Sequence, residues 1–90
     1  MIIFMDINEL IANVKKKLKK KIIIENIKIE DKTFLHKKHA NFQEGKFHIK
    51  IILESNELRS LNRIDSNKKI YNILSDELNK HIHSIQIIIR

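Results

Sequence analysis

Three stretches in which apolar and polar residues alternate constrain the fold of this chain most strongly. They are residues 22–30, 47–55 and 84–90, and each is rich in isoleucine. A two-residue period built from β-branched residues is typical of a β-strand that buries one face. The segment between the first two stretches, residues 31–46, is polar, holds the only glycine and is long for a hairpin connection. The sequence therefore predicts a sheet of three strands, with a long loop between the first two.

Two further stretches have the spacing of an amphipathic helix. The first is preceded by Asp6, a residue type that caps helix N-termini, and predicts a helix over residues 7–20. The second follows Ser66, which we interpret as its N-cap, and predicts a helix over residues 67–80. Residues 56–65 are expected to be irregular or to form a short helical turn. The two apolar stripes consist of Ile7, Leu10, Ile11, Val14 and Leu18, and of Ile70, Ile73, Leu74 and Leu78.

The order of these elements, α-β-β-α-β, defines the expected fold. The first two strands are expected to be antiparallel, whereas a strand–helix–strand connection within one sheet is usually parallel and right-handed. The expected architecture is an α+β fold with a three-stranded mixed sheet, covered on one face by the two helices. A chain of 90 residues has room for one such unit, so residues 1–90 are predicted to be a single domain.

Net charge and hydropathy narrow the possible partners. The formal net charge is +7, and six of the positive charges belong to one lysine cluster in the first predicted helix. This cluster is either a solvated helix end, enriched by an AT-rich coding sequence, or a surface for an anionic partner. No apolar run approaches the roughly 20 residues of a membrane span, so we expect no binding to membranes. We expect a soluble, cytoplasmic protein of bacterial origin. The lysine cluster consists of Lys15, Lys16, Lys17, Lys19, Lys20 and Lys21.

The chain has no cysteine but has five histidines, which makes imidazole its main candidate metal ligand. No pairing of a nucleophile with a base, no carboxylate pair and no phosphate-binding glycine loop is recognisable, so we expect no enzymatic activity. The histidines are His36 and His39 in the predicted loop, His48 in the second predicted strand, and His81 and His83 at the joint between the second helix and the third strand.

Four short stretches together resemble the BolA-like family, and the resemblance covers residues 7 to 90. From His48 through His83 the distances between these stretches match the family without an insertion or deletion, which makes the combination fairly specific. The resemblance implies a class II KH-like fold. In the family, the second histidine of the helix-to-strand joint is the characteristic residue. The four stretches are EDKTFLH (30–36), FHIKIILES (47–55), KIYNILSDEL (69–78) and HIHSIQI (81–87).

Two places depart from the family's pattern. Leu58 and Ser60 stand where the family usually has an aromatic residue and a glycine. Ser66, Asn67 and Lys68 stand where the family has a triplet similar to Arg-His-Arg at the start of its second helix. The helix start therefore carries one cation where the family has two cations and an imidazole.

The resemblance implies that the protein partners a monothiol glutaredoxin in iron–sulfur cluster trafficking or in iron and redox sensing. In that model a heterodimer shares one [2Fe–2S] cluster, with thiolates from the glutaredoxin and from glutathione. The resemblance makes His83 one ligand and His36 the loop ligand, with His39 as a substitute for His36. No cluster is expected on the isolated chain, which is expected to be a monomer or a weak homodimer.

Two other readings of the same residues stay open. The first is a DNA-binding transcriptional regulator that uses the KH-like fold and the lysine cluster, although the chain lacks the GxxG loop of a KH clamp. The second is a zinc site formed by His36, His39 and His83, since three histidines can hold a catalytic zinc. The zinc reading is the weaker, because no acid is placed to act as a general base.

Overall fold

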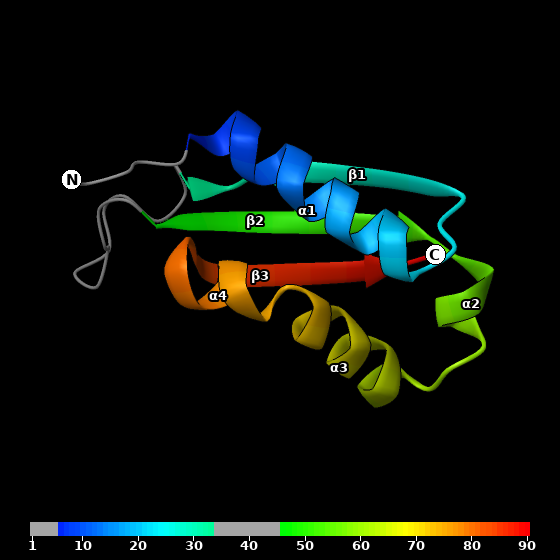
Figure 1. The fold of residues 1–90 in the computed structure, drawn as a ribbon. Helices are drawn as coiled ribbons and strands as arrows, with labels where there is room; N and C mark the ends of the chain where they lie inside the picture. The colour runs from blue at the N-terminus through cyan, green and yellow to red at the C-terminus, as the bar shows by residue number, and fades with distance from the viewer. Residues whose placement is uncertain (1–5, 34–45) are drawn as a thin grey trace.

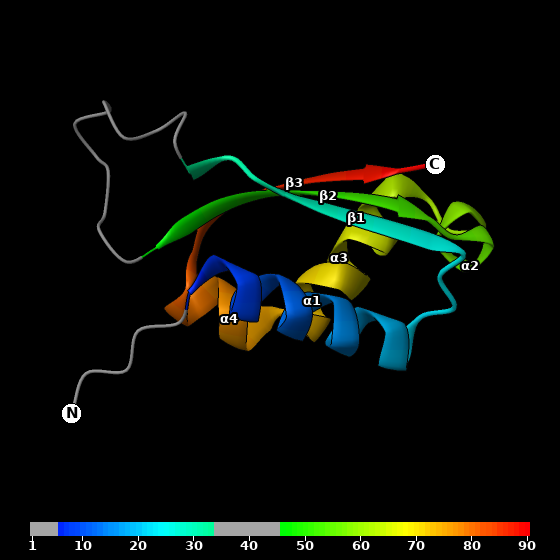
Figure 2. The same ribbon diagram turned by 90° about the horizontal axis from the view of Figure 1, so that it is seen from above.

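The computed structural model describes residues 6–33 and 46–90, which form a three-stranded sheet and four helices (Figure 1). Helices α1, α3 and α4 lie on one face of the sheet, and α2 lies at its end (Figure 2). The predicted α+β architecture is confirmed, with one more helical break than the sequence indicated. The helices are α1 (Ile7–Lys21), α2 (Asn56–Arg59), α3 (Arg63–Ile73) and α4 (Ser75–Lys80), and the strands are β1 (Asn26–Asp31), β2 (Phe47–Glu54) and β3 (Ile82–Ile89).

The sheet is mixed, with strand order β1-β2-β3. Strand β2 pairs with β1 in the antiparallel sense and with β3 in the parallel sense, as predicted. Ile51 lies at the centre, opposite Ile29 of β1 and Ile87 of β3. Among the described residues, β1 and β3 are therefore the two edges of the sheet.

The core lies between the helices and the inner face of the sheet. Both strands and helices contribute the apolar positions that the sequence periodicity indicated, so the predicted stripes are confirmed. Glu77 of α4 is also almost fully buried, and its carboxylate lies 2.5 Å from Nζ of Lys17 in α1. The buried apolar side chains include Leu10, Val14 and Leu18 of α1, Ile29 of β1, Ile49, Ile51 and Leu53 of β2, and Ile70 of α3.

The start of α1 was predicted correctly from the sequence, but the start of the strand that follows the helix was not. Asp6 caps the helix as predicted, because its carboxylate accepts a hydrogen bond of 2.8 Å from the Glu9 N–H. Strand β1, in contrast, begins at Asn26 and not at residue 22. Ile22 ends the helix and is buried, and the residues after it carry the chain from the helix layer to the sheet.

The predicted helix over residues 67–80 is wrong in two respects. Helix α3 begins at Arg63, and its N-cap is Asn62, which accepts a hydrogen bond of 2.8 Å from the Asp65 N–H. Ser66 is not the cap but a buried residue of the first turn, and its hydroxyl donates to the Arg63 carbonyl. The helix then breaks at Leu74, where φ is −98° and ψ is 14°, and α4 follows.

No helix in the described part of the chain is long and apolar enough to cross a membrane.

Candidate functional site

The joint between α4 and β3 is held by main-chain hydrogen bonds. His81 ends α4, and its N–H donates to the Glu77 carbonyl at 2.8 Å. The carbonyl of His81 accepts a hydrogen bond of 2.8 Å from the N–H of Phe47, the first residue of β2. These two bonds fix the start of β3 beside the start of β2.

The strand register shifts at this joint and turns His83 outward. Phe47 lies opposite Ile82, but the next residue, His48, lies opposite Ser84. His83 is therefore an extra residue in β3 with no partner in β2, as in a β-bulge. Ile82 is 2% exposed, whereas His83 and Ser84 are both exposed. The extra residue thus leaves the His83 imidazole accessible at a strand whose backbone is held by the sheet.

A second imidazole lies against His83. The ring centroids of His48 and His83 are 4.9 Å apart, with the rings tilted by 57°. His48 is 5% exposed, and its Nδ1 lies 2.6 Å from the Ser84 hydroxyl. The His48 main-chain N–H also donates to the hydroxyl of Thr33 at 3.2 Å. One ring is therefore accessible. The ring packed against it is hydrogen-bonded to Ser84, and its backbone is held by Thr33.

The open face of the sheet next to these histidines carries basic side chains. A hollow of about 240 Å³ is lined by Lys32, His48, Lys50, Ser84 and Gln86, together with Ile49 and Ile85. Burial raises the pKa of nearby Glu30, but a hydrogen bond from Lys28 and the charges of Lys32, Lys28 and Lys50 outweigh it and hold that pKa below its usual value. Glu30 is therefore a carboxylate at neutral pH within a basic surface.

The structure brings together only part of the predicted ligand set. His83 is accessible at the joint, while His36 and His39 lie outside the described residues. Within residues 6–33 and 46–90, no three His, Cys, Asp or Glu side chains are grouped so that they could hold a metal ion. The ligand roles of His83, His36 and His39 therefore stay predictions. The contacts of His48 with His83 and Ser84 agree with the packing or hydrogen-bonding role near the site that a histidine at the start of the second predicted strand suggests. The partner Ser84 itself was not predicted.

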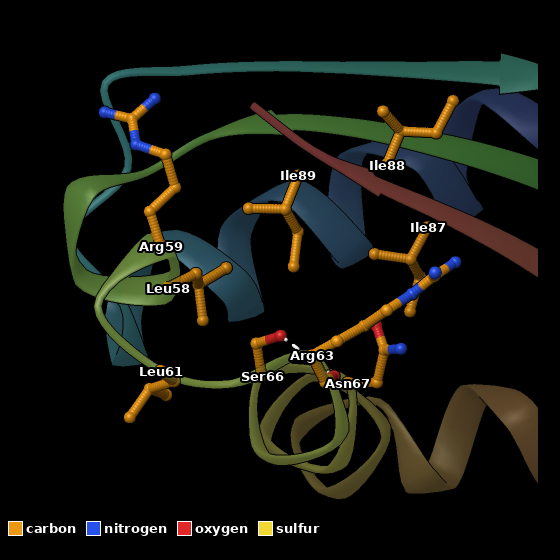
Figure 3. A pocket seen from close by; sticks show the side chains of 9 residues that line it. All are labelled: Leu58, Arg59, Leu61, Arg63, Ser66, Asn67, Ile87, Ile88 and Ile89. Carbon is orange, nitrogen blue, oxygen red and sulfur yellow. Dashed lines mark hydrogen bonds between the residues drawn. The ribbon is translucent and has the colours of Figure 1, made fainter.

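A second concave site lies between β3 and helices α2 and α3 (Figure 3). We call it the edge groove; its volume is about 360 Å³. Its apolar surface comes from Leu58 and from β3. Arg63 extends from the start of α3 toward Ile87, whereas Arg59 lines the groove from the end of α2 and its guanidinium points away from the other lining side chains (Figure 3). No pattern in the sequence indicates this site, because its residues come from three separate elements.

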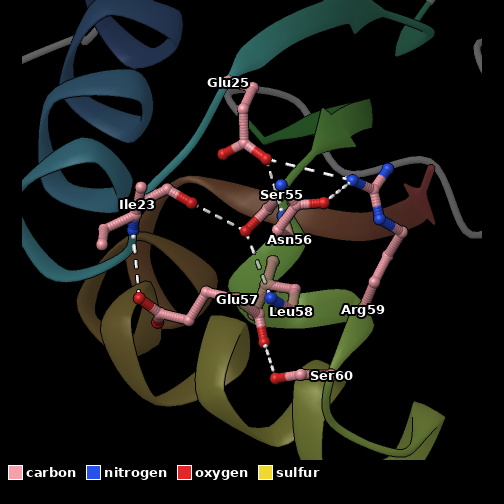
Figure 4. A network of polar contacts seen from close by, with 8 residues as sticks. All are labelled: Ile23, Glu25, Ser55, Asn56, Glu57, Leu58, Arg59 and Ser60. Atoms are coloured by element: carbon pink, nitrogen blue, oxygen red, sulfur yellow. Dashed lines mark hydrogen bonds and ion pairs between the residues drawn. The ribbon is translucent and has the colours of Figure 1, made fainter.

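Helix α2, which forms one wall of the edge groove, is fastened to the segment after α1 (Figure 4). The Ser55 hydroxyl donates to the Ile23 carbonyl at 2.7 Å and accepts from the Leu58 N–H. The Glu57 carboxylate accepts from the Ile23 N–H at 3.3 Å and from Lys69 Nζ at 2.7 Å. These contacts hold a helix of only four residues in place.

Replacing Glu57 with glutamine should lower stability in a pH-dependent way. The hydrogen bond from Lys69, and then that from Ile23, hold the pKa of Glu57 below its usual value. A carboxyl whose pKa is lower in the folded state stabilises the fold above the unfolded pKa of about 4.3, and this stabilisation is lost as pH falls through the folded pKa. Urea unfolding should therefore show the largest difference from wild type near neutral pH, and a shrinking difference below about pH 4.3. The matched control is Glu54→Gln, because Glu54 is exposed and has no ion pair among the described residues.

The fold and the histidine pair together define a small α+β domain that presents one imidazole at the root of an edge strand. The model of a protein family described as BolA-like protein matches residues 18–90. The chain therefore belongs to the BolA-like family, as its sequence indicated.

Individual relatives agree with this assignment. The chain is 26% identical over 74 residues to the DNA-binding transcriptional regulator BolA of Haemophilus influenzae, covering 82% of this chain and 69% of that protein. Its fold matches the BolA domain of SufE1 from Arabidopsis thaliana with a TM-score of 0.75 and 23% identity, over 88% of this chain and 87% of that one. It also matches BolA1 from Mus musculus with a TM-score of 0.68 and 18% identity, over 86% of this chain and 60% of that one. These structural matches confirm the fold.

Proposed function

We propose that this protein is a non-enzymatic, cytoplasmic partner of a monothiol glutaredoxin, and that its cargo is a [2Fe–2S] cluster shared between the two proteins. The observation that carries the proposal is the accessible imidazole of His83, at a register shift in a chain of the BolA-like family. In this proposal His83 and a loop histidine, His36 or His39, are the ligands from this chain. The thiolates come from the glutaredoxin and from glutathione.

The residues present suit this role chemically. Imidazole can replace thiolate as a ligand of a [2Fe–2S] iron, and the replacement raises the reduction potential. A neutral imidazole is also a weaker ligand than a thiolate, which suits a cluster that is passed on or sensed. His48 packs against His83, and the Ser84 hydroxyl lies 2.6 Å from His48 Nδ1. Such neighbouring contacts restrict the orientation of a ligating ring.

The test is reconstitution with a monothiol glutaredoxin, glutathione, iron and sulfide under argon. We expect a one-to-one heterodimer by size-exclusion chromatography with light scattering. We also expect a visible absorption spectrum that differs from that of the glutaredoxin alone with its cluster. A glutaredoxin spectrum that does not change when this protein is added, with the two proteins eluting separately, would contradict the proposal.

Binding to DNA is the second candidate function. It is favoured by the name of the Haemophilus influenzae relative, a DNA-binding transcriptional regulator, and by the lysine cluster of α1. Three of these lysines form the last turn of the helix, beside Ile23, which is 74% exposed. Lysines arranged in this way can contact phosphates without reading base sequence.

Titration of a labelled DNA duplex at two salt concentrations distinguishes a sequence-specific DNA-binding protein from one that is only attracted to phosphates. Affinity that falls steeply with salt and does not depend on base sequence would indicate phosphate contacts alone. Sequence-dependent binding that persists at physiological salt would support a regulator. Replacing Lys19, Lys20 and Lys21 by glutamine should weaken either kind of binding if α1 is the contact surface.

A further inference from the structure

The edge groove combines an apolar floor with two cationic side chains. Leu58 is buried at the base, and Ile87 and Ile89 of β3 form the side opposite the helices (Figure 3). Arg59 comes from the end of α2 and Arg63 from the start of α3. Among the described residues that line the groove there is no aspartate or glutamate. The groove is therefore suited to a ligand that is apolar along its length and carries negative charge.

The two arginines differ in how far their charge is already neutralised. Arg59 hydrogen-bonds to Asn56 and lies 4.0 Å from the Glu25 carboxylate, at the limit of an ion pair (Figure 4). The side chain of Arg63 has no hydrogen bond or ion pair with any residue that the structure describes. A guanidinium can bind a carboxylate through two parallel hydrogen bonds, which makes arginine a strong carboxylate receptor. Arg63 is therefore the stronger candidate for contact with an acidic group.

The backbone of β3 offers main-chain hydrogen-bonding groups on the side facing away from β2. The Arg90 N–H donates to the Leu53 carbonyl of β2 at 2.7 Å. Because successive residues of a strand direct their main-chain groups to opposite sides, those of Ile88 also face β2, while those of Ile87 and Ile89 face away from it. No strand lies beyond β3 in the part of the chain that the structure describes. The same two isoleucines that line the groove therefore present main-chain donors and acceptors along it.

We propose that the edge groove binds an extended acidic peptide segment of a partner protein, which adds to β3 as a fourth strand and places a carboxylate on Arg63. Strand addition uses main-chain hydrogen bonds for affinity and side-chain pockets for selectivity. The site lies at the far end of β3 from His83, so the proposal is independent of cluster binding.

Two other occupants fit the groove less well. A second copy of the chain would have to pair with β3 around Ile88 to fill the groove. That arrangement would bring the arginines of both copies together, and like charges oppose it. A single-stranded nucleic acid would place phosphates, which only accept hydrogen bonds, against a strand edge that offers carbonyls as well as N–H groups. The described residues that line the groove also include no aromatic side chain on which a base could stack.

The experiment uses a fluorescein-labelled peptide of alternating valine and threonine with a glutamate at each end, about six residues long, the usual strand length. Fluorescence anisotropy should show binding in the micromolar range to the wild-type protein. Arg63→Gln should weaken binding about tenfold, the effect of losing one charge-assisted pair. The matched control, Lys68→Gln, removes an exposed cation from the same helix outside the groove lining and should change affinity less than about twofold.

Two further measurements distinguish strand addition from loose charge attraction. In NMR spectra, the amides of Ile87 and Ile89 should shift and exchange more slowly when the peptide is added, while that of Ile88 should change less. A peptide N-methylated on alternate amides, on the side that pairs with β3, should lose binding. Three results would each overturn the proposal. They are wild-type affinity for a peptide with lysine in place of both glutamates, wild-type affinity for the N-methylated peptide, and unchanged affinity of Arg63→Gln for the original peptide. Preferential, Arg63-dependent binding of oligo-dT would also overturn it, as would a concentration-dependent homodimer that protects the same amides.

Discussion

Replacing His83 with alanine should remove the spectral change that this protein causes in a cluster-loaded monothiol glutaredoxin. His83 is the accessible imidazole at the register shift, and in the proposed function it is bound directly to iron. Loss of a residue that only orients a ligand typically costs 10- to 100-fold in metal affinity. Loss of the ligand itself should cost more, and we expect the shared cluster to be lost at concentrations at which the wild-type complex retains it.

His81→Ala is the matched control for this experiment. His81 is also an imidazole and lies only two residues away, but it ends α4 and faces the hollow lined by Lys16, Lys17 and Lys20 of α1. Its replacement should leave the spectrum of the shared cluster unchanged. Unfolding curves of both variants should resemble that of wild type, because neither side chain belongs to the apolar core. A wild-type spectrum from His83→Ala, with the heterodimer intact, would show that the iron ligand lies elsewhere.

Replacing Ile51 with alanine should cause the largest loss of stability among single substitutions in the sheet. Ile51 is 0% exposed at the centre of the middle strand, and truncation of such a side chain typically costs 2–5 kcal/mol. A chain of 90 residues has a total unfolding free energy of about 5–13 kcal/mol. We therefore expect the melting temperature to fall by more than about 10 °C.

Ile52→Ala provides the comparison, because Ile52 is the next residue of β2 and points to the open face of the sheet, where it is only half-buried. Its truncation should lower the unfolding free energy by less than about 1.5 kcal/mol. Circular dichroism with chemical and thermal unfolding measures both effects. Equal destabilisation by the two substitutions would contradict the assignment of the inner face of the sheet.

The strands and their pairing could be predicted because isoleucines recur with a two-residue period on both sides of a long polar segment. The start of α3 could not be fixed by the same reasoning. Asn62 and Ser66 are both good N-caps, and only the structure shows that Asn62 is used while Ser66 is buried. The break at Leu74 had no signal in the sequence, since no proline or glycine marks it.

The candidate site was predictable in its residue types but not in its geometry. Alternation through Ile85 and Ile87 would place His83 on the inner face, because these residues are two and four positions further along the strand. The register shift between Phe47 and His48 reverses that orientation, and a shift of this kind depends on how two strands meet. The edge groove is likewise assembled from side chains that are distant in sequence.

The additional residue in β3 makes chain length at this joint as important as residue identity. If one residue between Lys80 and Ser84 were deleted, β3 could continue in step with β2 from Phe47 onward. The side chain that then preceded Ser84 would point toward the helices, and a histidine there would be enclosed by them. A substitution at the joint between α4 and β3 changes one side chain. A deletion there would move the imidazole from the open face of the sheet to the face covered by the helices.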